Sequence, residues 1–399
     1  MQSARISRRQ LIAGAASGVI GRAFAAVPPA SPVAIARCAT YDQEMFRTLG
    51  GLMNQIGGIE GLVKGRTVAV KLNLTGNVER YPERPEMPYR NHPATVLALA
   101  KLLSNAGAQR IRIIEAFFPA SQELELWARY GLDVKAISNV GCKVEWENTQ
   151  NLGQAKQYER LKVPSGGYIF PAFDLNHSFT DCDVYVSLSK LKQHATAGVT
   201  MAMKNNFGNT PCSLYGGDCG ESGNENPTQE RGPVCHNGSR TPPKGVPQEL
   251  DGNTPREGGY RVPRIVVDAV GARPIDLAIV DGIESIKGGE GVWNRGVGYV
   301  KPGLLLAGKN PVCVDAVSTA VMAATRLRTA GRASSLIATT PLNWRRPRAS
   351  ARGTCRASNC RGSGSKRCFS TTARGRSQRL RSGEARLLRR NLDGKVNSL

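Results

Sequence analysis

Residues 187–208, SLSKLKQHATAGVTMAMKNNFG, bring three lysines, one histidine and two asparagines together after an apolar strand expected over 183–188. Side chains alternate between the two faces of a strand, so Lys190, Lys192 and His194 are expected to project from one side. Open α/β sheets bind ligands in the crevice at the carboxyl ends of their strands. We therefore expect a site for an anion, a phosphate or a carboxylate substrate; the alternative is a solvated edge whose lysines lie in water.

These residues are expected to take two kinds of role. His194 is the candidate general acid or base, because the unperturbed pKa of histidine lies near neutrality and neighbouring lysines lower it further. Lys192 and Lys204 complete the candidate catalytic set, since their charges neutralise an anionic substrate. The candidate substrate-binding residues are Lys71, Asn73, Lys190, Asn205 and Asn206.

Three carboxylates are available as oxygen donors to a divalent metal: Asp281, Glu290 and Asp315. Asp281 ends a predicted strand and precedes a glycine. Glu290 belongs to the glycine-rich turn 288–291, whose backbone N–H groups could wrap an anion. For Asp315 the alternative is a charge that stabilises the N-terminus of a helix expected over 314–322.

The ten cysteines show no C-x-x-C pair and no four-cysteine spacing, which argues against an iron–sulfur cluster or a zinc ribbon in this chain. Cys212, Cys219 and Cys235 fall in one stretch, and His236 follows directly. A disulfide between two of these cysteines is the simpler interpretation. A metal site that uses all three cysteines and the histidine is the alternative.

Alternating strands and helices position these residues. A capping box, Thr40 with Gln43, begins an amphipathic helix that ends at 57–58. The next elements expected are a strand over 67–74, a helix from Pro93 to Gly107 and a strand over 110–115. The alternation recurs after 122–130 and over 264–281, which predicts an α/β fold with a largely parallel central sheet flanked by helices.

A long irregular insertion interrupts this pattern. Between residues 209 and 260 the chain is rich in Gly, Pro, Asn and Ser and has no regular period. Loops of this length within a domain are usually functional covers or disordered. Because the segment follows Lys204, Asn205 and Asn206 directly, we expect it to form a lid over the site.

The first residues predict export. Arg8-Arg9, with Ser7 before and Leu11 after, precede a small apolar run over 13–20 and an Ala23-Phe24-Ala25 cleavage pattern. Residues 1–25 are therefore expected to be a signal peptide for the twin-arginine export machinery. The protein would then be periplasmic or extracellular. That route carries folded proteins, which agrees with a metal or redox cofactor inserted before export.

The charge of +23 is unevenly distributed. Residues 326–399 hold 19 Lys and Arg against two acids, or +17, whereas the body over 26–325 carries only about +2. The body therefore has no electrostatic footprint for nucleic acid, and we expect none as its partner.

Five groups of residues carry a family resemblance: VKLNL at 70–74, SKLKQH at 189–194, KNNFG at 204–208, DGI at 281–283 with GEG at 289–291, and VDAV at 314–317. With them the chain resembles, over about residues 68–322, exported members of the family called domain of unknown function 362. The resemblance implies one α/β domain, 26–325, with a polar site assembled from these motifs. Some relatives carry ferredoxin-type cysteine clusters, which this chain lacks. Val292 also departs from the pattern, which has proline there.

The tail departs further from that family. After the helix that holds Asp315, the resemblance implies a glycine-rich and acidic loop, a helix and a strand, but residues 326–399 are basic and lack a lasting period. We interpret them as the product of a frameshift or sequencing artefact; a native basic tail that binds nucleic acid or an anionic membrane is the alternative. In both cases we expect a disordered segment that is no packed part of the domain.

Two functions remain for the body. The first is an exported enzyme that acts on an anionic small molecule in a Lys/His/Asp cleft, with a divalent metal or redox cofactor. The second is a non-catalytic protein that binds an anion or a metal. An enzyme needs His194 within hydrogen-bond reach of a carboxylate or a ligand, whereas a binding protein needs only the cations and backbone amides. An interaction protein that uses the basic tail would leave the lysines and histidine unexplained.

Overall fold

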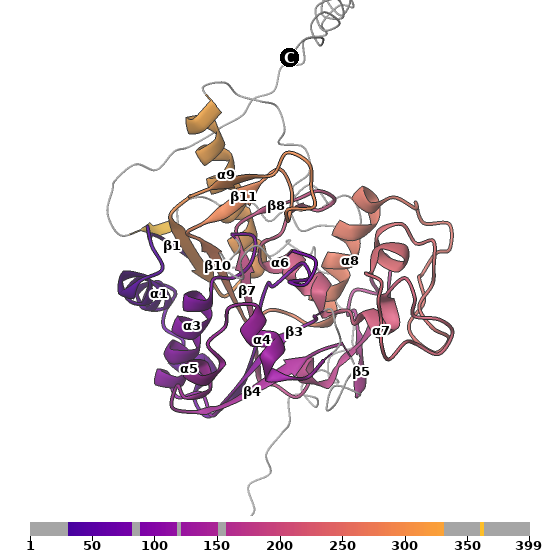
Figure 1. The fold of residues 1–399 in the computed structure, drawn as a ribbon, viewed down its shortest axis with the longest axis horizontal. Coiled ribbons are helices and arrows are strands. Elements are labelled where there is room, and N and C mark those ends of the chain that lie inside the picture. The colour runs from indigo at the N-terminus through magenta and orange to yellow at the C-terminus, as the bar shows by residue number, and fades with distance from the viewer. Residues whose placement is uncertain (1–30, 82–87, 118–120, 151–156, 331–359, 363–399) are drawn as a thin grey trace, which may run out of the picture. The chain divides into compact units, whose positions relative to one another are not determined.

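The computed structural model describes residues 31–81, 88–117, 121–150, 157–330 and 360–362 of the 399-residue chain, with side chains up to residue 323 of the last helix (Figure 1). The predicted signal peptide, residues 1–25, lies outside the described residues, as does most of the basic tail. Among the helices that are described, none combines the length and the apolar character needed to cross a membrane.

One large sheet forms the centre of the described residues (Figure 1). Its strands in chain order are β1 (Val33–Arg37), β2 (Thr67–Lys71), β3 (Arg110–Glu115), β4 (Lys143–Asn148), β7 (Val184–Lys190), β10 (Leu277–Gly282), β13 (Leu304–Gly308) and β14 (Cys360–Gly362). Their spatial order is β14-β1-β13-β10-β7-β2-β3-β4. Neighbours from β10 to β4 are parallel, and β13 is antiparallel to both β10 and β1. The expectation of a largely parallel sheet is confirmed.

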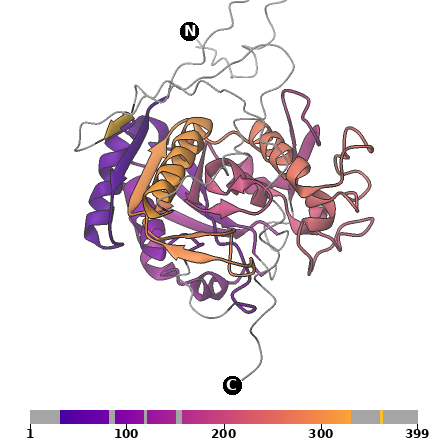
Figure 2. The ribbon, with the colours of Figure 1, turned by 90° about the horizontal axis from the view of Figure 1, so that it is seen from above.

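Helices cover both faces of this sheet (Figures 1 and 2). In β2, Val68 and Val70 pack in one apolar cluster while Ala69 packs in the other, because successive side chains point to opposite faces. Strands β2, β7 and β10 are buried on both faces, and most of their residues are accordingly apolar. The first face is covered by α1 (Gln43–Gln55), α3 (Pro93–Asn105), α4 (Leu124–Arg129) and α5 (Val134–Ser138), and the second by α6 (Met201–Asn205), α8 (Gly258–Ala272) and α9 (Pro311–Ala330).

The predicted helix ends are close to those observed. Helix α3 begins with Pro93 and stops before Gly107, whose φ of +83° suits glycine, as expected. The capping box at the start of α1 is wrong in detail. Asp42, not Thr40, caps the helix, and its carboxylate accepts the N–H of Glu44 at 2.8 Å. Thr40 donates its hydroxyl to Asp42, which holds the capping carboxylate in place.

Smaller elements surround the sheet. They are α2 (Glu60–Val63), the pairs β5 (Tyr158–Lys162) with β6 (Ala172–Asn176), β8 (Gln193–His194) with β9 (Gly198–Val199) and β11 (Ser285–Lys287) with β12 (Gly298–Val300), and the 3₁₀ turns η3 (His177–Phe179) and η4 (Asn206–Asn209).

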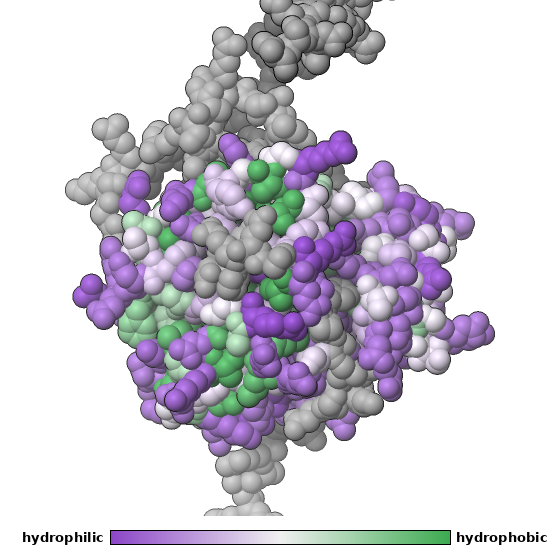
Figure 3. Space-filling model, viewed as in Figure 1, coloured by the Kyte–Doolittle hydropathy of each residue, from purple (hydrophilic) through white to green (hydrophobic). Residues whose placement is uncertain are grey.

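The insertion over 209–260 has little regular structure, as expected. It contains the short helix α7 (Cys212–Tyr215) and a single π-helical turn, η5 (Gly232–His236). Figure 3 shows a largely hydrophilic surface over this part of the molecule, at the right, whereas apolar residues gather at the lower left. The insertion is therefore built mainly from polar turns that pack against α8.

Two parts of the expected disordered tail have structure. Helix α9 continues to Ala330, and Cys360–Gly362 forms β14, which pairs in parallel with β1. The expectation of a separate tail is wrong for these residues. The reason is that the outer edge of β1 offers unpaired backbone groups, which an extended segment of any composition can satisfy. The rest of the tail lies outside the described residues.

Candidate functional site

A cavity of about 160 Å³ lies at the carboxyl ends of β7, β2 and β3. The chain passes from β2 to β3 and β4 on one side and later adds β7 on the other side of β2. Strand order therefore reverses between β2 and β7, and such switch points are where open α/β sheets bind ligands. The cavity is small, since about 30 Å³ is the share of one liquid water, so it suits a compact ligand.

Seven of the predicted site residues line this cavity: Lys71, Asn73, Lys192, His194, Lys204, Asn205 and Glu290. Lys190, Asn206, Asp281 and Asp315 do not line it. Further lining residues that the sequence analysis missed include Glu115, Thr200, Glu230, Arg231, His236 and Trp293.

Lys71 and Glu115 form a buried ion pair on the floor of the cavity. Lys71 Nζ also donates to the carbonyl of Leu72 at 2.7 Å, and the second carboxylate oxygen of Glu115 accepts the N–H of Leu74 at 2.8 Å. Burial lowers the pKa of Lys71, and the charge of Glu115 opposes that shift. Glu115 ends the strand expected over 110–115, so its position at the end of a strand was the signal available.

Lys192 is almost fully buried, at 1% exposure, and its Nζ donates to the carbonyl of Tyr89 at 2.6 Å. Burial holds the pKa of Lys192 well below its usual range, nearby Lys204 and Lys190 lower it further, and Glu290 opposes the shift. The interpretation of these lysines as a solvated edge is therefore wrong.

Lys204 lies in the last turn of helix α6, and its Nζ lies 4.1 Å from the ring centroid of Phe207. Burial lowers the pKa of Lys204 to about 7, with Arg231 and Lys71 adding to the shift and Glu290 opposing it. Its Nζ has no hydrogen-bond partner among the residues that the structure describes. Near neutral pH a substantial share of this side chain is therefore an uncharged amine.

His194 presents an N–H group rather than a basic nitrogen. Its Nδ1 accepts the backbone N–H groups of Thr196 and Ala197, both at 3.2 Å. Burial holds the pKa of His194 well below its usual range, and the charges of Lys204 and Lys192 add to the shift. The neutral ring therefore carries its proton on Nε2, so the expected role as a base is not supported and a role as a donor is.

Glu290 is held in one position by its neighbours. It accepts the N–H of Ala195 and the indole N–H of Trp293, both at 3.0 Å. A Cβ at Gly76 or Gly291 would lie 2.7 or 2.2 Å from the Trp293 ring, so both positions need glycine for the ring to pack there. The turn expected to wrap an anion with its amides instead fixes a carboxylate near the lysines.

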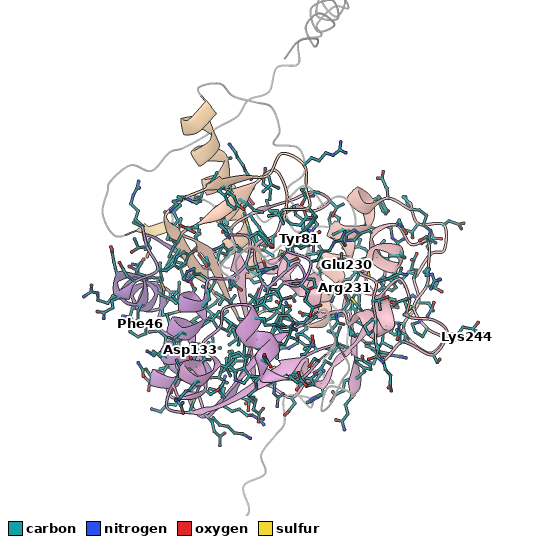
Figure 4. The ribbon with its side chains drawn as sticks, viewed as in Figure 1. Phe46, Tyr81, Asp133, Glu230, Arg231 and Lys244 are labelled. Atoms are coloured by element: carbon teal, nitrogen blue, oxygen red, sulfur yellow. The ribbon has the colours of Figure 1, made fainter. Side chains whose placement is uncertain are left out.

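The insertion contributes Glu230, Arg231 and His236 to the cavity wall. Figure 4 shows Glu230 and Arg231 in the middle of the view, whereas Lys244 of the same insertion lies at its outer edge. Arg231 is anchored by its Nε, which donates to the carbonyl of Thr210 at 2.5 Å. Burial lowers the pKa of His236 to about 4, so this second imidazole is also neutral. The insertion therefore covers part of the cavity; its opening and closing stay a prediction.

Lys190 belongs to a separate buried network. Strand β7 ends at Lys190, and the chain then turns, so the alternation does not carry on to Lys192 and His194. Lys190 pairs with Asp281 at 2.9 Å, and the hydroxyl of Tyr41 accepts from Lys190 and donates to Asp281. These groups satisfy one another and stabilise the fold.

Asn206 has a structural role as well. Its Nδ2 donates to the carbonyl of Arg273 at 3.0 Å, and its Oδ1 accepts the hydroxyl of Tyr185 at 2.9 Å. These bonds tie the segment after α6 to the turn after α8. Adjacent residues on a helical segment point in different directions, so Asn205 faces the cavity and Asn206 does not.

The three predicted metal ligands do not form one site. Asp281 is paired with Lys190, Glu290 lies in the cavity, and Asp315 accepts the N–H groups of Ala202 and Met203 at 2.8 and 2.9 Å. Asp315 thus caps helix α6 from the neighbouring helix α9. No group of three or more His, Cys, Asp or Glu suited to a metal occurs in the described part of the chain.

The cysteines of the insertion are free thiols, so neither the disulfide nor the cysteine metal site is formed. Cys219 and Cys235 pack in the apolar cluster beneath the insertion, and Cys212 is buried in α7. Their neighbour His236 lines the cavity instead. Each thiol is therefore used as a small apolar group.

The fold and the cavity together define an α/β protein with a cavity lined by charged residues at the switch point of a mostly parallel sheet. The chain belongs to the family described as Domain of unknown function (DUF362), which matches residues 68–320. It is 28% identical over 187 residues to the thylakoid-associated protein sll1697 of Synechocystis sp., covering 45% of this chain and 50% of that protein.

Among solved structures, the lactate racemase apoprotein from Thermoanaerobacterium thermosaccharolyticum is similar, with a TM-score of 0.35 and 14% identity over 67% of this chain and 53% of that chain. The chain thus spans about half the length of each of these two proteins. A likeness at this TM-score does not bear on function.

Proposed function

We propose that this protein is an enzyme that binds a small anionic molecule in the cavity and removes a proton from it with Lys204. The observation that carries the proposal is the environment of Lys204: an amine that lines the cavity, close to other cations, with a pKa lowered to about 7. A desolvated lysine beside other positive charges is a recurrent way to obtain a base at neutral pH.

The other cations account for binding. Lys192 and Arg231 line the same cavity, and Lys192 has a carbonyl but no carboxylate as its hydrogen-bond partner within the described residues. A buried ammonium is costly, and an anionic ligand would add to the partial compensation that the charge of Glu290 gives. The cavity of about 160 Å³ limits that ligand to a few heavy atoms beyond its anionic group.

In this mechanism the amine of Lys204 takes a proton from the substrate and becomes an ammonium. The Nε2–H of His194 donates a hydrogen bond to the substrate oxygen on which negative charge then develops. Glu290, fixed by Trp293 and Ala195, stabilises the ammonium of Lys204 after the transfer. Every group is already held in place by packing or by backbone hydrogen bonds, so little reorganisation is needed.

A second candidate is a non-catalytic anion-binding protein. One observation favours it: His194 bonds only to backbone and hydroxyl groups of its own turn and to no carboxylate among the described residues. Such a histidine can bind an anion without acting as an acid–base group. The location also stays a proposal: we propose that the protein is exported and acts in the periplasm or outside the cell.

Hydrogen–deuterium exchange at carbon separates the two candidates. The protein is incubated in D₂O with a panel of small carboxylates and phosphate esters, and NMR follows the loss of C–H signals. Wild type is expected to exchange at least one bound anion, Lys204→Met to lose the exchange, and Lys135→Met, a change at an exposed lysine of α5, to keep it. Binding without exchange of any bound anion would support the binding protein instead.

A further inference from the structure

The side-chain amides of Asn73 and Asn205 form a hydrogen bond in one wall of the cavity, and their orientations follow from their other partners. The Nδ2 of Asn205 lies 3.3 Å from the carbonyls of both Lys71 and Leu188, and carbonyls only accept. The amide of Asn205 can therefore point only one way, with its oxygen toward Asn73. Asn73 Nδ2 donates to that oxygen at 3.1 Å.

Asn73 is left with an unused acceptor. Because its Nδ2 is engaged, its Oδ1 is the free end of the amide, and this atom is buried without a hydrogen-bond partner in the described structure. The residue is 8% exposed and lines the cavity. A buried acceptor without a donor costs about 1–3 kcal/mol, so a ligand that offers a donor here would be favoured.

Thr200 shows the same feature. It lines the cavity, is 4% exposed, and its Oγ1 has no partner among the described residues. A hydroxyl can both donate and accept. The cavity thus combines cations, which only donate, with an amide oxygen that only accepts and a hydroxyl that does both.

A simple carboxylate cannot satisfy this set, because it has no donor for Asn73 Oδ1. We propose that the ligand is a small hydroxycarboxylate: its carboxylate is bound by Lys192 and Arg231, and its hydroxyl donates to Asn73 Oδ1. This inference rests on the proposed function, since it uses the same cavity. It assigns to Asn73 the discrimination between a hydroxyl and a methyl group, with Thr200 in support.

Three small acids test the inference on the wild-type protein: glycolate, propionate and acetate, with inorganic phosphate as a further anion. Propionate has a methyl group where glycolate has its hydroxyl, so it controls for size. Titration calorimetry is expected to show that glycolate binds about tenfold more tightly than propionate, because the methyl group leaves Asn73 Oδ1 unpaired.

Two variants locate the effect. Asn73→Leu is expected to bring the glycolate-to-propionate ratio to about one while propionate still binds, and Thr200→Val, which keeps the volume, to lower the ratio by a smaller factor. A thermal melt checks that each variant folds. A ratio that neither folded variant changes would overturn the assignment to Asn73 and Thr200.

The remaining outcomes separate this inference from the proposed function. Equal binding of glycolate and propionate overturns the hydroxycarboxylate but leaves an anion site. Binding of phosphate alone has the same consequence for the carboxylate class. If none of the four anions binds to wild type, the anion cavity itself is refuted, and the inference fails with it.

Discussion

At the scale of single residues, the cavity places amines where water cannot solvate them well. Lys192 is buried against a carbonyl, and Lys204 lies against the ring of Phe207. Glu115 forms an ion pair with Lys71, so the burial of Lys71 destabilises the fold less than the burial of Lys192 and Lys204 does. Burial lowers the pKa of all three lysines, and Lys204, with a pKa of about 7, is the one to which we assign the role of a base.

The low pKa of Lys204 predicts that this residue lowers the free energy of unfolding by an amount that depends on pH. Its pKa is about 7 in the folded protein, whereas an unfolded lysine titrates near about 10.4. Between these values the unfolded chain holds a proton that the folded chain has released. The free energy of unfolding therefore rises with pH in this window, and the full cost is present below pH 7.

Lys204→Met removes the destabilisation by the buried ammonium. The variant is expected to be more stable than wild type at pH 6.5, by at least about tenfold in the unfolding equilibrium constant, and the difference should shrink by pH 9.5. Urea denaturation at both pH values measures it, with Lys135→Met as the exposed control. A difference that does not vary with pH would contradict the assignment.

The pH dependence of the C–H exchange rate is a second test of Lys204. If Lys204 is the base, the rate of C–H exchange is expected to rise with pH through about 7 and to level off above it, because only the neutral amine accepts a proton. A rate that falls over this range would point to an acid instead. Initial rates by NMR between pH 5.5 and 9 measure the profile.

At the scale of elements, helix α6 carries Lys204, the proposed base. It has only five residues, so it needs stabilisation from outside. Asp315 of helix α9 provides this by accepting the N–H groups of Ala202 and Met203, next to Met201, whose φ of +41° is unusual for a side-chain residue. Helices α6 and α9 therefore position Lys204 and Asn205 together.

Burial raises the pKa of Asp315 to about 7, although both N–H groups oppose that shift. Between about pH 4 and pH 7 the folded chain therefore holds a proton that the unfolded chain has lost. The unfolding free energy should fall as pH rises through this window. Asp315→Asn has no such group, so its stability is expected to depend less on pH there.

Chemical denaturation at pH 5 and pH 7.5 tests this difference. The matched control is Asp133→Asn, an exposed capping carboxylate on α5 that is labelled in Figure 4. The control should keep the pH dependence of wild type, because asparagine caps a helix about as well as aspartate. An unchanged slope in Asp315→Asn would refute the role of the buried carboxylate.

At the scale of the whole molecule, the insertion joins the sheet edge to form the cavity. It contributes Arg231 and His236, and η5 packs on α8. Limited proteolysis tests the prediction that it acts as a lid: cleavage within 209–260 is expected to slow when glycolate or phosphate is bound. A cleavage rate that no bound anion changes would argue against a lid.

Export is a second proposal that concerns the whole chain. Replacement of Arg8 and Arg9 by lysine is expected to leave the protein in the cytoplasm, because the twin-arginine machinery reads the paired guanidinium groups. Cell fractionation of both forms measures the distribution. A variant exported as well as wild type would refute this route.

Much of the fold could be predicted from the sequence because the signals are local. Apolar periods of two or 3.6 residues, Pro93 at a helix start and Gly107 at its end are set by neighbours in the chain. They predict the strands and helices, and their alternation predicts the parallel sheet. Strands β1 and β13 were missed, since their antiparallel pairing depends on partners more than 260 residues apart, Val33 with Gly308.

The sequence by itself determined that the chain has an α/β fold and that Lys192 and Lys204 follow apolar elements. Only the tertiary structure decided which polar groups meet. Strand order places β2 between β7 and β3, so Glu115 at the end of β3 pairs with Lys71 at the end of β2, and the path of the insertion adds Arg231. Side-chain direction after a strand ends depends on the turn that follows, and therefore Lys190, which a strand period groups with Lys192, stabilises the fold instead.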